Sequence, residues 1–464
     1  MSPEITTSAF DASYKIADVT YTHPFYAFLA PAWLDYVAVL NGVTPPDRRG
    51  GFSWCDLGCG FGVTAVGLAA THGNGRFGGI DMNAGHIDDA QCLARDAAVE
   101  NATFLATDIA TADREAESFD YIVAHGVYTW VGPQTQAELC RFIDHHLKPG
   151  GLVYVSYNAL PGCQRDLAFQ RLLYAFADTA PGDSIERVKA ALEGVREPLG
   201  AGVPTLKDSR SLAQIVESPG RYAPSYLVHE YLVGSWRPVW VTEVRAAMAA
   251  IGLSPVGSAT IVENHDSFVL GRAARATLGR IEDEDIRELT RDFFISQEFR
   301  RDVFIRDRVP LDEEQRVRRL FGSSLALPYP SACVTFSAQT PAGRLTFENA
   351  AARAVVAALE GGPATLESIA QQSGHDREDL LDNTFALIAG GHVRPVEPIR
   401  APVRAINRAI LDRCGTANAI NDLMLPCGTA VDVEDALLTA LAADSVLDDE
   451  KFPGWRRFFA AHGL

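Results

Sequence analysis

Short apolar runs alternate with longer amphipathic stretches along the first third of the chain. The apolar runs predict buried strands over 52–57, 77–80, 103–106, 121–124 and 152–157. Apolar spacing over 63–70 predicts the first turns of a helix. The strands recur about every 25 to 30 residues with helical patterns between them, so the sequence predicts an α/β fold with a doubly wound, mostly parallel, Rossmann-like sheet.

Beyond the fifth predicted strand the spacing becomes helical. It predicts two amphipathic helices, over 167–176 and 185–195, and a later helix over 241–250. The stretches SPVG and SFVLGR that follow are expected to form the closing strands of the sheet. We therefore expect a core over 1–275 with a helical insertion over 162–235, which lies above the carboxyl ends of the strands and either selects a ligand or only stabilises the fold.

The last third of the chain is mainly helical in pattern. A charged helical stretch predicts a connecting module over 276–340. A winged-helix-like module is predicted over 341–464, because residues 348–396 show its order of helix, short helix, turn, long helix and strand. Its would-be recognition helix begins with the acidic sequence DRED (376–379), which a DNA duplex would repel. A protein-contact or homodimerisation module is the favoured interpretation, and its removal is then expected to leave ligand binding by the core intact.

Charge and cysteine content narrow the functional classes. The chain carries 41 Lys and Arg against 59 Asp and Glu, a formal net charge of −18, which argues against nucleic acid as a partner. The eight cysteines form no C-x-x-C pair, so we expect reduced thiols and no metal site. The first residues show neither a basic leader nor an apolar core, and no apolar stretch reaches the ~18 residues that span a bilayer, so we expect a cytoplasmic protein without membrane insertion.

A glycine cluster, DLGCGFG over 56–62, lies between the first predicted strand and helix. Val63 stands where the dinucleotide fingerprint G-x-G-x-x-G needs its third glycine, so a nicotinamide site is excluded. What remains is acidic-x-G-x-G-x-G, with Asp56 ahead of Gly58 and Gly60. Such a turn either brings the backbone close to a ligand or is a tight turn without one.

Two carboxylates follow the next predicted strands. Asp81 ends the second strand, at the distance from the glycine loop that a ribose-binding acid requires. Asp108 follows the third strand, where a carboxylate could accept from the exocyclic amine of an adenine. Each residue alone is more often a helix cap. Together with the loop they predict a site for an adenosine that carries no phosphates.

The motifs DLGCGFG, GIDM, TD, FDYIVAHGVYTWV and LKPGG occur in this order and resemble those of class I S-adenosylmethionine-dependent methyltransferases. The resemblance implies that the glycine loop passes under the methionine part of the cofactor, that Asp81 holds the ribose, and that Asp108 reads the adenine. The implied cofactor-binding residues are Asp56, Gly58, Cys59, Gly60, Asp81, Met82, Asp108, Ile109 and Ala124.

A finer resemblance covers roughly residues 14–308 and, more weakly, the rest. The stretches ADVTYTHPF, HGVYTWV, YVSYNALPG, YLVHEYL and RDFFISQEFRRDVFIRD are similar to bacterial methyltransferases with a methyltransferase regulatory domain, a group that includes lysine methyltransferases of outer-membrane proteins. The resemblance implies methyl transfer to a protein side chain. The segment THPFYAFLAPAW departs from the expected polar pattern, at the place where the amino-terminal part would close over the cofactor.

Candidate catalytic residues follow the fourth and fifth predicted strands. They are His125, Tyr128, Tyr157 and Asn158, whose hydroxyl, imidazole or amide groups could orient an acceptor amine. Core packing is the alternative for each tyrosine, and a structural histidine is the alternative to a base at position 125. Two further sets are weaker candidates: Tyr14 and Tyr21 for closing over the cofactor, and His229 with Glu230 for positioning.

Methyl transfer to a protein side chain, such as that of lysine, is the favoured function, by in-line displacement at the sulfonium. The ammonium must lose a proton first, because its unperturbed pKa is about 10.4. A small-molecule acceptor, or an interaction protein that uses the cofactor domain as a sensor, remain the alternatives. Cofactor binding and label transfer distinguish them.

Overall fold

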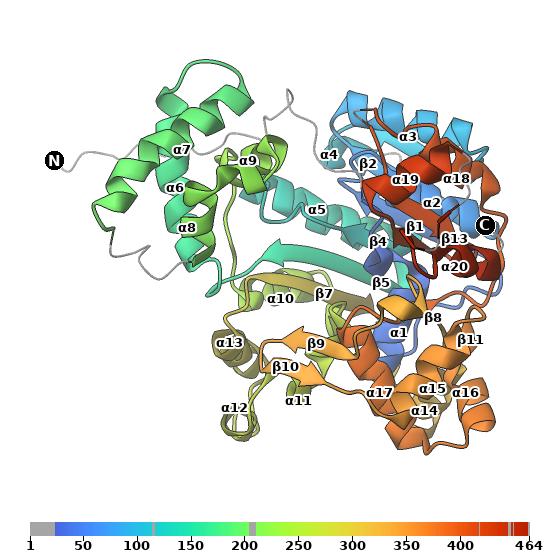
Figure 1. Cartoon of the computed structure of the whole chain (residues 1–464). Coiled ribbons are helices and arrows are strands. Elements are labelled where there is room, and N and C mark those ends of the chain that lie inside the picture. The colour runs from blue at the N-terminus through green and yellow to red at the C-terminus, as the bar shows by residue number, and fades with distance from the viewer. Residues whose placement is uncertain are drawn as a thin grey trace.

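The central sheet has seven strands in the order β3-β2-β1-β4-β5-β7-β6. The structure is a computed structural model, shown in Figure 1, that describes residues 24–113, 117–203, 210–416, 418–443, 447–448 and 450–462. The sheet strands are β1 (Phe52–Leu57), β2 (Gly75–Asp81), β3 (Ala102–Ala106), β4 (Phe119–Ala124), β5 (Leu147–Asn158), β6 (Leu253–Ser258) and β7 (Phe299–Arg306). The first five run parallel, and β7 pairs antiparallel with both β5 and β6. The predicted Rossmann-like sheet is confirmed.

Alternate residues of the inner strands pack into two different layers. Trp54 of β1 and Tyr121 of β4 belong to one apolar core, while their chain neighbours Cys55 and Ile122 belong to another. This follows from the two-residue period of a strand whose faces are both covered. All six residues of β1 are buried for that reason.

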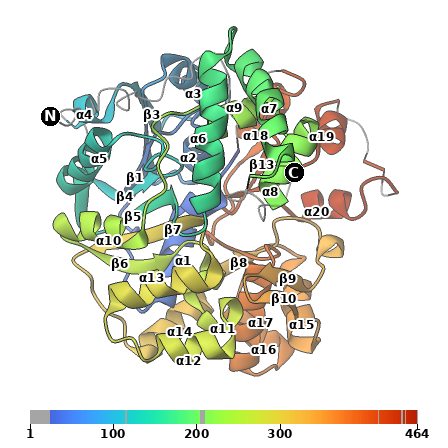
Figure 2. The same ribbon diagram turned by 90° about the vertical axis from the view of Figure 1, so that its left-hand side faces the viewer.

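Helices cover both faces of the sheet, as Figures 1 and 2 show. One layer contains α1 (Pro31–Leu40), α2 (Val63–Thr71) and α3 (Ala84–Asp96). The other contains α4 (Ile109–Ala112), α5 (Pro133–His146) and α10 (Val241–Ala250).

The predicted helical insertion is present and has an apolar core of its own. It consists of α6 (Gln164–Thr179), α7 (Ser184–Gly200), α8 (Arg210–Glu217) and α9 (Pro224–Tyr231). Figure 1 shows these helices beyond the carboxyl end of β5, the edge at which α/β sheets bind ligands. We refer to α6–α9 as the cap.

The closing strands differ in part from the prediction. SPVG lies in β6 as expected, but the apolar stretch SFVLGR includes the end of α11 (Asp266–Val269) and forms no strand. The strand of the sheet that comes last along the chain is β7, which lies inside the region that we expected to be wholly helical. The flanking helices are α12 (Arg272–Leu278), α13 (Glu284–Ile295) and α14 (Glu313–Gly322). The sheet therefore extends beyond residue 275.

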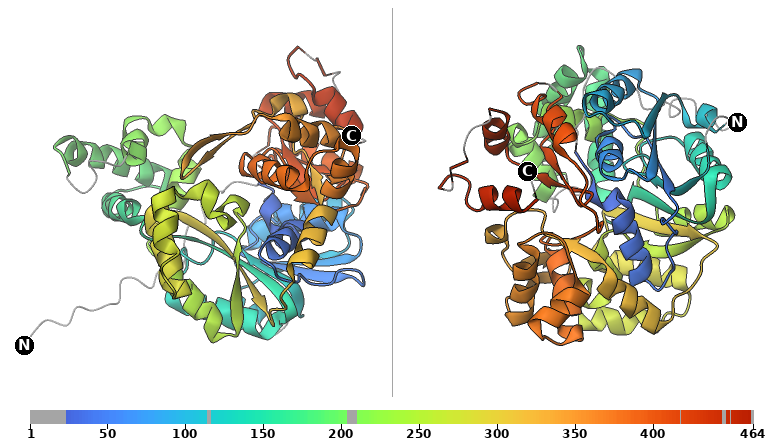
Figure 3. Two further views of the ribbon diagram at one scale, coloured as in Figure 1. Left: turned by 90° about the horizontal axis from the view of Figure 1, so that it is seen from below. Right: turned by 90° about the vertical axis from the view of Figure 1, so that its right-hand side faces the viewer.

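The C-terminal third packs onto the same layer as α1 and α2, as Figures 2 and 3 allow the reader to follow. The predicted order of helix, short helix, helix and strand is found over residues 350–396, the elements on either side of that stretch were not predicted, and the winged-helix comparison stays a prediction. The elements of this third are β8 (Ser324–Ala326), β9 (Ser337–Thr340), β10 (Gly343–Thr346), α15 (Ala350–Leu359), β11 (Ala364–Thr365), α16 (Leu366–Ser373), α17 (Arg377–Ala389), β12 (Arg394–Val396), α18 (Arg404–Leu411), β13 (Asp422–Leu425), β14 (Thr429–Asp432), α19 (Asp435–Ala442) and α20 (Trp455–His462).

Candidate active site

A cavity of about 900 Å³ lies at the carboxyl ends of β1, β2 and β4, beneath the cap. Its lining joins the glycine loop and the ends of β2 and β3 to the loop after β4, and α9 of the cap adds His229 and Glu230. Parallel α/β sheets bind their ligands at this edge, beside the first strand. The cavity is therefore the candidate active site.

The glycine loop takes backbone conformations that side chains disfavour. Gly58 has a φ of +79°, and a Cβ there would lie 2.5 Å from Cγ2 of Val127. Gly60 has a φ of +52°, and a Cβ there would meet no protein atom within 4 Å, although the residue lines the cavity. The turn thus needs glycine for its own packing at position 58 and leaves the space at position 60 open to a ligand.

The amino end of α2 follows directly from this loop. Its N-cap residue, Gly62, has no side chain, so no side-chain oxygen caps the first turn. Val63 and Thr64, the first residues of the helix, line the cavity. First-turn amides and the positive end of a helix dipole suit a carboxylate such as that of a methionine.

Asp81 connects the end of β2 to the glycine loop. Its carboxylate accepts from the amide of Gly60 at 2.9 Å and from the amide of Asn83 at 2.8 Å. A carboxylate has about four lone-pair sites, so both oxygens keep acceptor capacity for the hydroxyls of a ribose. Asp81 lines the cavity, and the N-cap of α3 is Asn83. The helix-cap alternative for Asp81 is thus not the arrangement observed.

Asp56 places a buried carboxyl group without a partner at the cavity. The residue is 6% exposed, and its Oδ1 atom has no hydrogen-bond partner among the described residues. Burial, with a smaller contribution from Asp81, raises the pKa of Asp56 to about 8. An unsatisfied buried acceptor beside an anion-binding helix end fits the ammonium group of a methionine.

The predicted adenine side has a polar and an apolar part. Asp108 lines the cavity but also caps α4, because Oδ1 accepts from the Thr111 amide at 2.7 Å and Oδ2 from its hydroxyl at 3.0 Å. The Thr111 amide is the main reason why the pKa of Asp108 is lowered. Met82, which is 62% exposed, and Ile109 offer apolar surface beside it.

Two aromatic residues that the sequence analysis missed lie on this side. Phe61 and His86 line the cavity, with ring centroids 4.3 Å apart. The His86 Nδ1 atom is 3.5 Å from Oδ1 of Asp81. Phe61 lies between Gly60 and Gly62, and His86 lies in the first turn of α3. These positions were readable signals, because they follow the carboxyl ends of β1 and β2.

His125 lies in the cavity wall within a cluster of rings. Its Nδ1 atom is 2.9 Å from the Tyr154 hydroxyl and 3.0 Å from the Ser156 hydroxyl, and its ring is 4.3 Å from that of Tyr26. Burial, and then the nearby Arg301, lower the pKa of His125 to about 3. The imidazole is therefore neutral at physiological pH and a weak base, which favours the structural alternative.

Asn158 also lines the cavity, but its amide oxygen is occupied. Oδ1 accepts from the Thr129 hydroxyl and from the Trp236 indole nitrogen, each at 3.0 Å. The predicted use of this oxygen for an acceptor ammonium would compete with both donors. The arrangement instead ties the end of β5 to the segment that follows the cap.

Three predicted site residues lie away from the cavity in the part of the chain that the structure describes. Tyr157 is fully buried, and its hydroxyl donates to Asp302, while Tyr128 packs 6.3 Å from it, centroid to centroid, in the same apolar core. Ala124 belongs to that core as well. For Tyr157 the physical reason is strand alternation, since a one-residue step along β5 moves a side chain to the opposite face, whereas Tyr128 lies in the loop after β4. Tyr14 and Tyr21 lie outside the described residues.

The part of the cavity lining outside residues 56–109 gathers residues from distant segments. Tyr26, Trp130 and Phe299 contribute rings, and Glu138 and Glu230 contribute carboxyl groups. Burial, and then Asp56, raise the pKa of Tyr26 to about 12, so its phenol stays protonated. Of these residues the sequence analysis singled out Glu230 alone, because no local motif connects the others.

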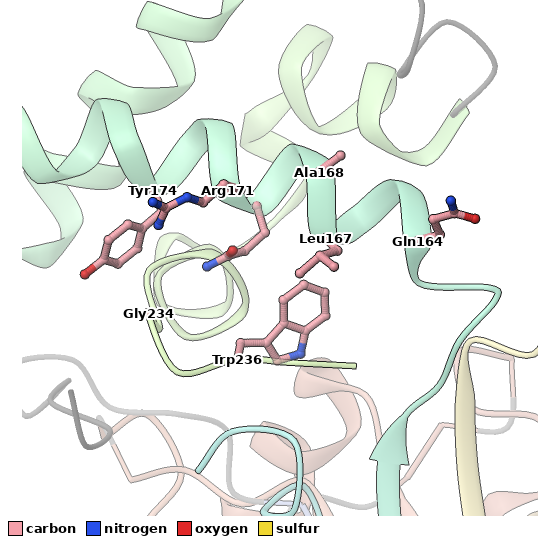
Figure 4. Close-up of a pocket in the computed structure, with 8 residues that line it drawn as sticks. Gln164, Leu167, Ala168, Arg171, Tyr174, Gly234 and Trp236 are labelled. Carbon is pink, nitrogen blue, oxygen red and sulfur yellow. The ribbon is translucent and has the colours of Figure 1, made fainter. Parts of the chain in front are cut away.

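A second, smaller pocket of about 340 Å³ lies between α6 and the segment after α9 (Figure 4). Leu167 and Trp236 form an apolar wall, and Arg171 and Tyr174 lie along α6. The Trp236 ring is 5.9 Å from that of Trp130, which lines the main cavity. The pocket and the cavity are thus neighbours across a pair of tryptophans.

A group of metal-type side chains lies outside the cavity lining. Asp113, His145 and His146 hold donor atoms within 4.8 Å of one another. Oδ1 of Asp113 is 2.9 Å from Nδ1 of His145 and 3.2 Å from Nε2 of His146. These contacts join α4 to the end of α5.

Within the described residues, no helix combines the length and apolar character needed to cross a bilayer.

Comparisons with known proteins agree with this geometry. Residues 55–151 match the family described as "Methyltransferase domain", and residues 223–306 match "Predicted methyltransferase regulatory domain". The uncharacterised protein sll1526 of Synechocystis is 30% identical over 359 residues, which cover 77% of this chain and 71% of that protein. The uncharacterised protein RP028 of Rickettsia prowazekii is 29% identical over 216 residues, 46% of this chain and 83% of that protein.

The solved structure of PKMT2 from Rickettsia typhi in complex with AdoHcy has the same fold. It superimposes with a TM-score of 0.71 at 20% identity and covers 92% of this chain and 88% of that one. The region matched to the regulatory family contributes α10, β6 and β7, so it completes the sheet itself. The chain therefore belongs to the S-adenosylmethionine-dependent methyltransferases that carry a methyltransferase regulatory domain.

Proposed function

We propose that this methyltransferase acts on the side-chain amine of a lysine in a protein. The observation that carries the proposal is the part of the cavity lining outside residues 56–109, where Glu138 and Glu230 line the same space as Tyr26, Trp130 and Phe299. Carboxylates attract an ammonium group, and aromatic faces attract a lysine cation and its methylated product. The sequence resemblance to lysine methyltransferases adds independent support.

The same proposal places the cofactor along the glycine loop. Asp81 would hold the ribose hydroxyls, Asp108 and Met82 would border the adenine, and Asp56 would accept from the methionine ammonium. The open space at Gly60 and the unpartnered Oδ1 atom of Asp56 both fit this placement. When bound, S-adenosylmethionine supplies a methyl group on a sulfonium, which is already activated for transfer.

The protein's contribution is then alignment and removal of water. Holding an amine in line with the methyl group supplies up to roughly 7 to 11 kcal/mol of the barrier reduction. The amine must reach this position neutral, and His125, whose pKa is lowered to about 3, is a poor base for that purpose. Loss of water around the amine in the closed site would instead disfavour its charged form, so that the ammonium releases its proton to water on entry. The carboxylates attract the ammonium during entry.

The test is label transfer from methyl-labelled S-adenosylmethionine to a lysate of the cell that encodes the protein, followed by peptide mass spectrometry. We expect label on lysine residues of protein bands, and loss of that label with Asp81→Ala. Label confined to small molecules would contradict the proposal in favour of a metabolite enzyme. Label on protein residues other than lysine would retain the enzyme class and overturn the acceptor.

A further inference from the structure

The C-terminal hairpin, β13 and β14 (residues 422–432), packs directly against the methyltransferase core. Met424 is 1% exposed and lies in the same apolar core as Phe25 and α2. A Cβ added at Gly67 of α2 would lie 2.7 Å from Sδ of Met424 and 3.1 Å from the ring of Phe25. The helix, the hairpin and the Phe25 ring therefore meet at one point, where a side chain on α2 would separate them.

A hydrogen bond joins the hairpin to the segment that borders the cavity. The amide of Phe25 donates to Oδ2 of Asp422 at 2.8 Å. Phe25 is 7% exposed and points into the core, whereas its neighbours Pro24 and Tyr26 both line the cavity. The carboxylate of Asp422 thus fixes the backbone between two cavity-lining residues.

The position of Tyr26 matters for the site. Its amide donates to Oγ1 of Thr64 at 3.0 Å, and Thr64 lies in the first turn of α2 and lines the cavity. Its ring lies 4.3 Å from His125, centroid to centroid. A shift of the Phe25 backbone would therefore move a wall of the cavity at its methionine end.

The hairpin is itself held rigidly. Asn407 of α18 donates to the carbonyl of Met424 at 2.9 Å and accepts from its amide at 2.7 Å. Beyond α18, Arg413 and Asn418 contact the carboxylate of Asp89 on α3 at 3.0 and 2.9 Å. The first turn of α3 lines the cavity, so the C-terminal region contacts two elements of the cofactor side.

We propose that the C-terminal hairpin is part of the cofactor site, with Asp422 as a positioning residue that holds the Pro24–Tyr26 segment over the cavity through the Phe25 amide. This inference rests on the cofactor placement proposed above. It replaces the expectation that residues 341–464 are dispensable for cofactor binding. Two charged groups face the carboxylate of Asp422: that of Asp432 on the paired strand β14, and the guanidinium of Arg394 at the start of β12.

The test is calorimetric binding of S-adenosylhomocysteine to the full chain and its variants. Asp422→Ala should raise the dissociation constant at least about fivefold, and the amide of Phe25 should exchange faster with deuterium. The matched control is Asp432→Ala, which removes an exposed carboxylate directly opposite in the same hairpin. It should leave the dissociation constant within about twofold of the wild type.

The outcomes separate this proposal from the cofactor placement. A folded Asp422→Ala variant with unchanged affinity overturns the positioning role if Asp81→Ala weakens binding in the same assay. Unchanged affinity in Asp81→Ala overturns the cofactor placement and this proposal with it. If Asp422→Ala fails to fold, Asp422→Asn keeps a neutral acceptor. It should bind more weakly than wild type, with faster Phe25 exchange, and wild-type values for both would overturn the role.

Discussion

One part of the cavity lining, at the glycine loop and the strand ends that follow it, comes from one continuous stretch of chain, whereas the other part draws on segments hundreds of residues apart. The first part lies within residues 56–109, at three successive strand ends. The second combines Tyr26, the loop after β4, α9 and Phe299. Contacts that come from one stretch are specified together by local sequence. Contacts gathered by the fold can change one at a time, so we expect the acceptor to vary more readily than the cofactor.

The largest effects are expected from the two glycines of the loop. Comparing them separates a loss of stability at Gly58 from a loss of cofactor affinity at Gly60. Gly58→Ala introduces a clash with Val127 at a positive φ and should lower the free energy of unfolding by about 2 kcal/mol or more. Gly60→Ala is also strained by the positive φ but meets no protein atom, so it should cost less stability, about 1 kcal/mol, while it weakens S-adenosylhomocysteine binding. Denaturant unfolding and calorimetry measure the two effects. Equal losses of stability would remove the distinction.

Asp81→Ala is expected to weaken cofactor binding by at least ~1.4 kcal/mol, which is a factor of ten. The cavity lining outside residues 56–109, where we propose that the acceptor binds, should be unaffected, so the KM for the acceptor should change little. The measurement is binding of S-adenosylhomocysteine, with the circular dichroism spectrum as a check of folding. Unchanged affinity in a folded variant would show that the ribose lies elsewhere.

Asp56→Asn tests the buried carboxyl group through pH. The pKa of Asp56 is raised from 3.8 to about 8 in the folded protein, so its contribution to stability is fully present below about pH 4 and is lost as pH rises through 8. The wild type should therefore lose stability relative to Asp56→Asn across this interval. Urea unfolding at several pH values measures the difference. Parallel curves would mean that Asp56 is not held neutral.

Glu138→Gln and Glu230→Gln test the acceptor contacts proposed for the cavity lining outside residues 56–109. Each removes one charge that attracts an ammonium group, so each should raise the acceptor KM by about three- to tenfold. Binding of S-adenosylhomocysteine should stay within about twofold of the wild type. Steady-state kinetics with the lysine substrate identified by label transfer gives the comparison. Weaker binding of S-adenosylhomocysteine with an unchanged acceptor KM would mean that these carboxylates border the cofactor and not the acceptor.

The smallest effect is expected at His125. Because its pKa is lowered to about 3, the residue should not titrate between pH 5 and 9. His125→Asn should leave the shape of the pH–rate profile in that range unchanged, even if the rate falls through altered packing. Loss of an ionisation near pH 6 to 7 in the variant would identify His125 as a base.

The strands that the sequence predicted well are those in which burial of apolar side chains dominates. β1 was located to the residue because every side chain is apolar or buried and a glycine loop follows. β7 was missed because its sequence, FRRDVFIR, looks solvent-exposed. Arg300 and Asp302 are nevertheless buried, since they pair with each other at 3.1 Å and with groups on other elements. Such pairing is long-range information, which local periodicity does not contain.

The candidate site divides in the same way. Eight of the nine residues predicted for the cofactor line the cavity, and Ala124 is the exception. Among the four predicted catalytic residues, His125 and Asn158 line it and the two tyrosines do not. Whether a residue at a strand end points to the cavity or to the core depends on strand register, and one position decides it. The contributions of Tyr26 and Phe299 depend on how remote segments pack.

The hydrogen bonds of the glycine loop bear on the enzyme's turnover. The amides of Gly58 and Cys59 donate to the Ile80 carbonyl, and that of Gly60 donates to Asp81. The loop is thus preorganised by the end of β2, so binding of a ligand does not carry the entropic cost of ordering the loop. S-adenosylmethionine and the spent cofactor differ by one methyl group and by the positive charge of the sulfonium, and both meet the same preorganised loop. We expect cofactor exchange to proceed without remodelling of this loop, which leaves movement of the acceptor side to set the pace of the cycle.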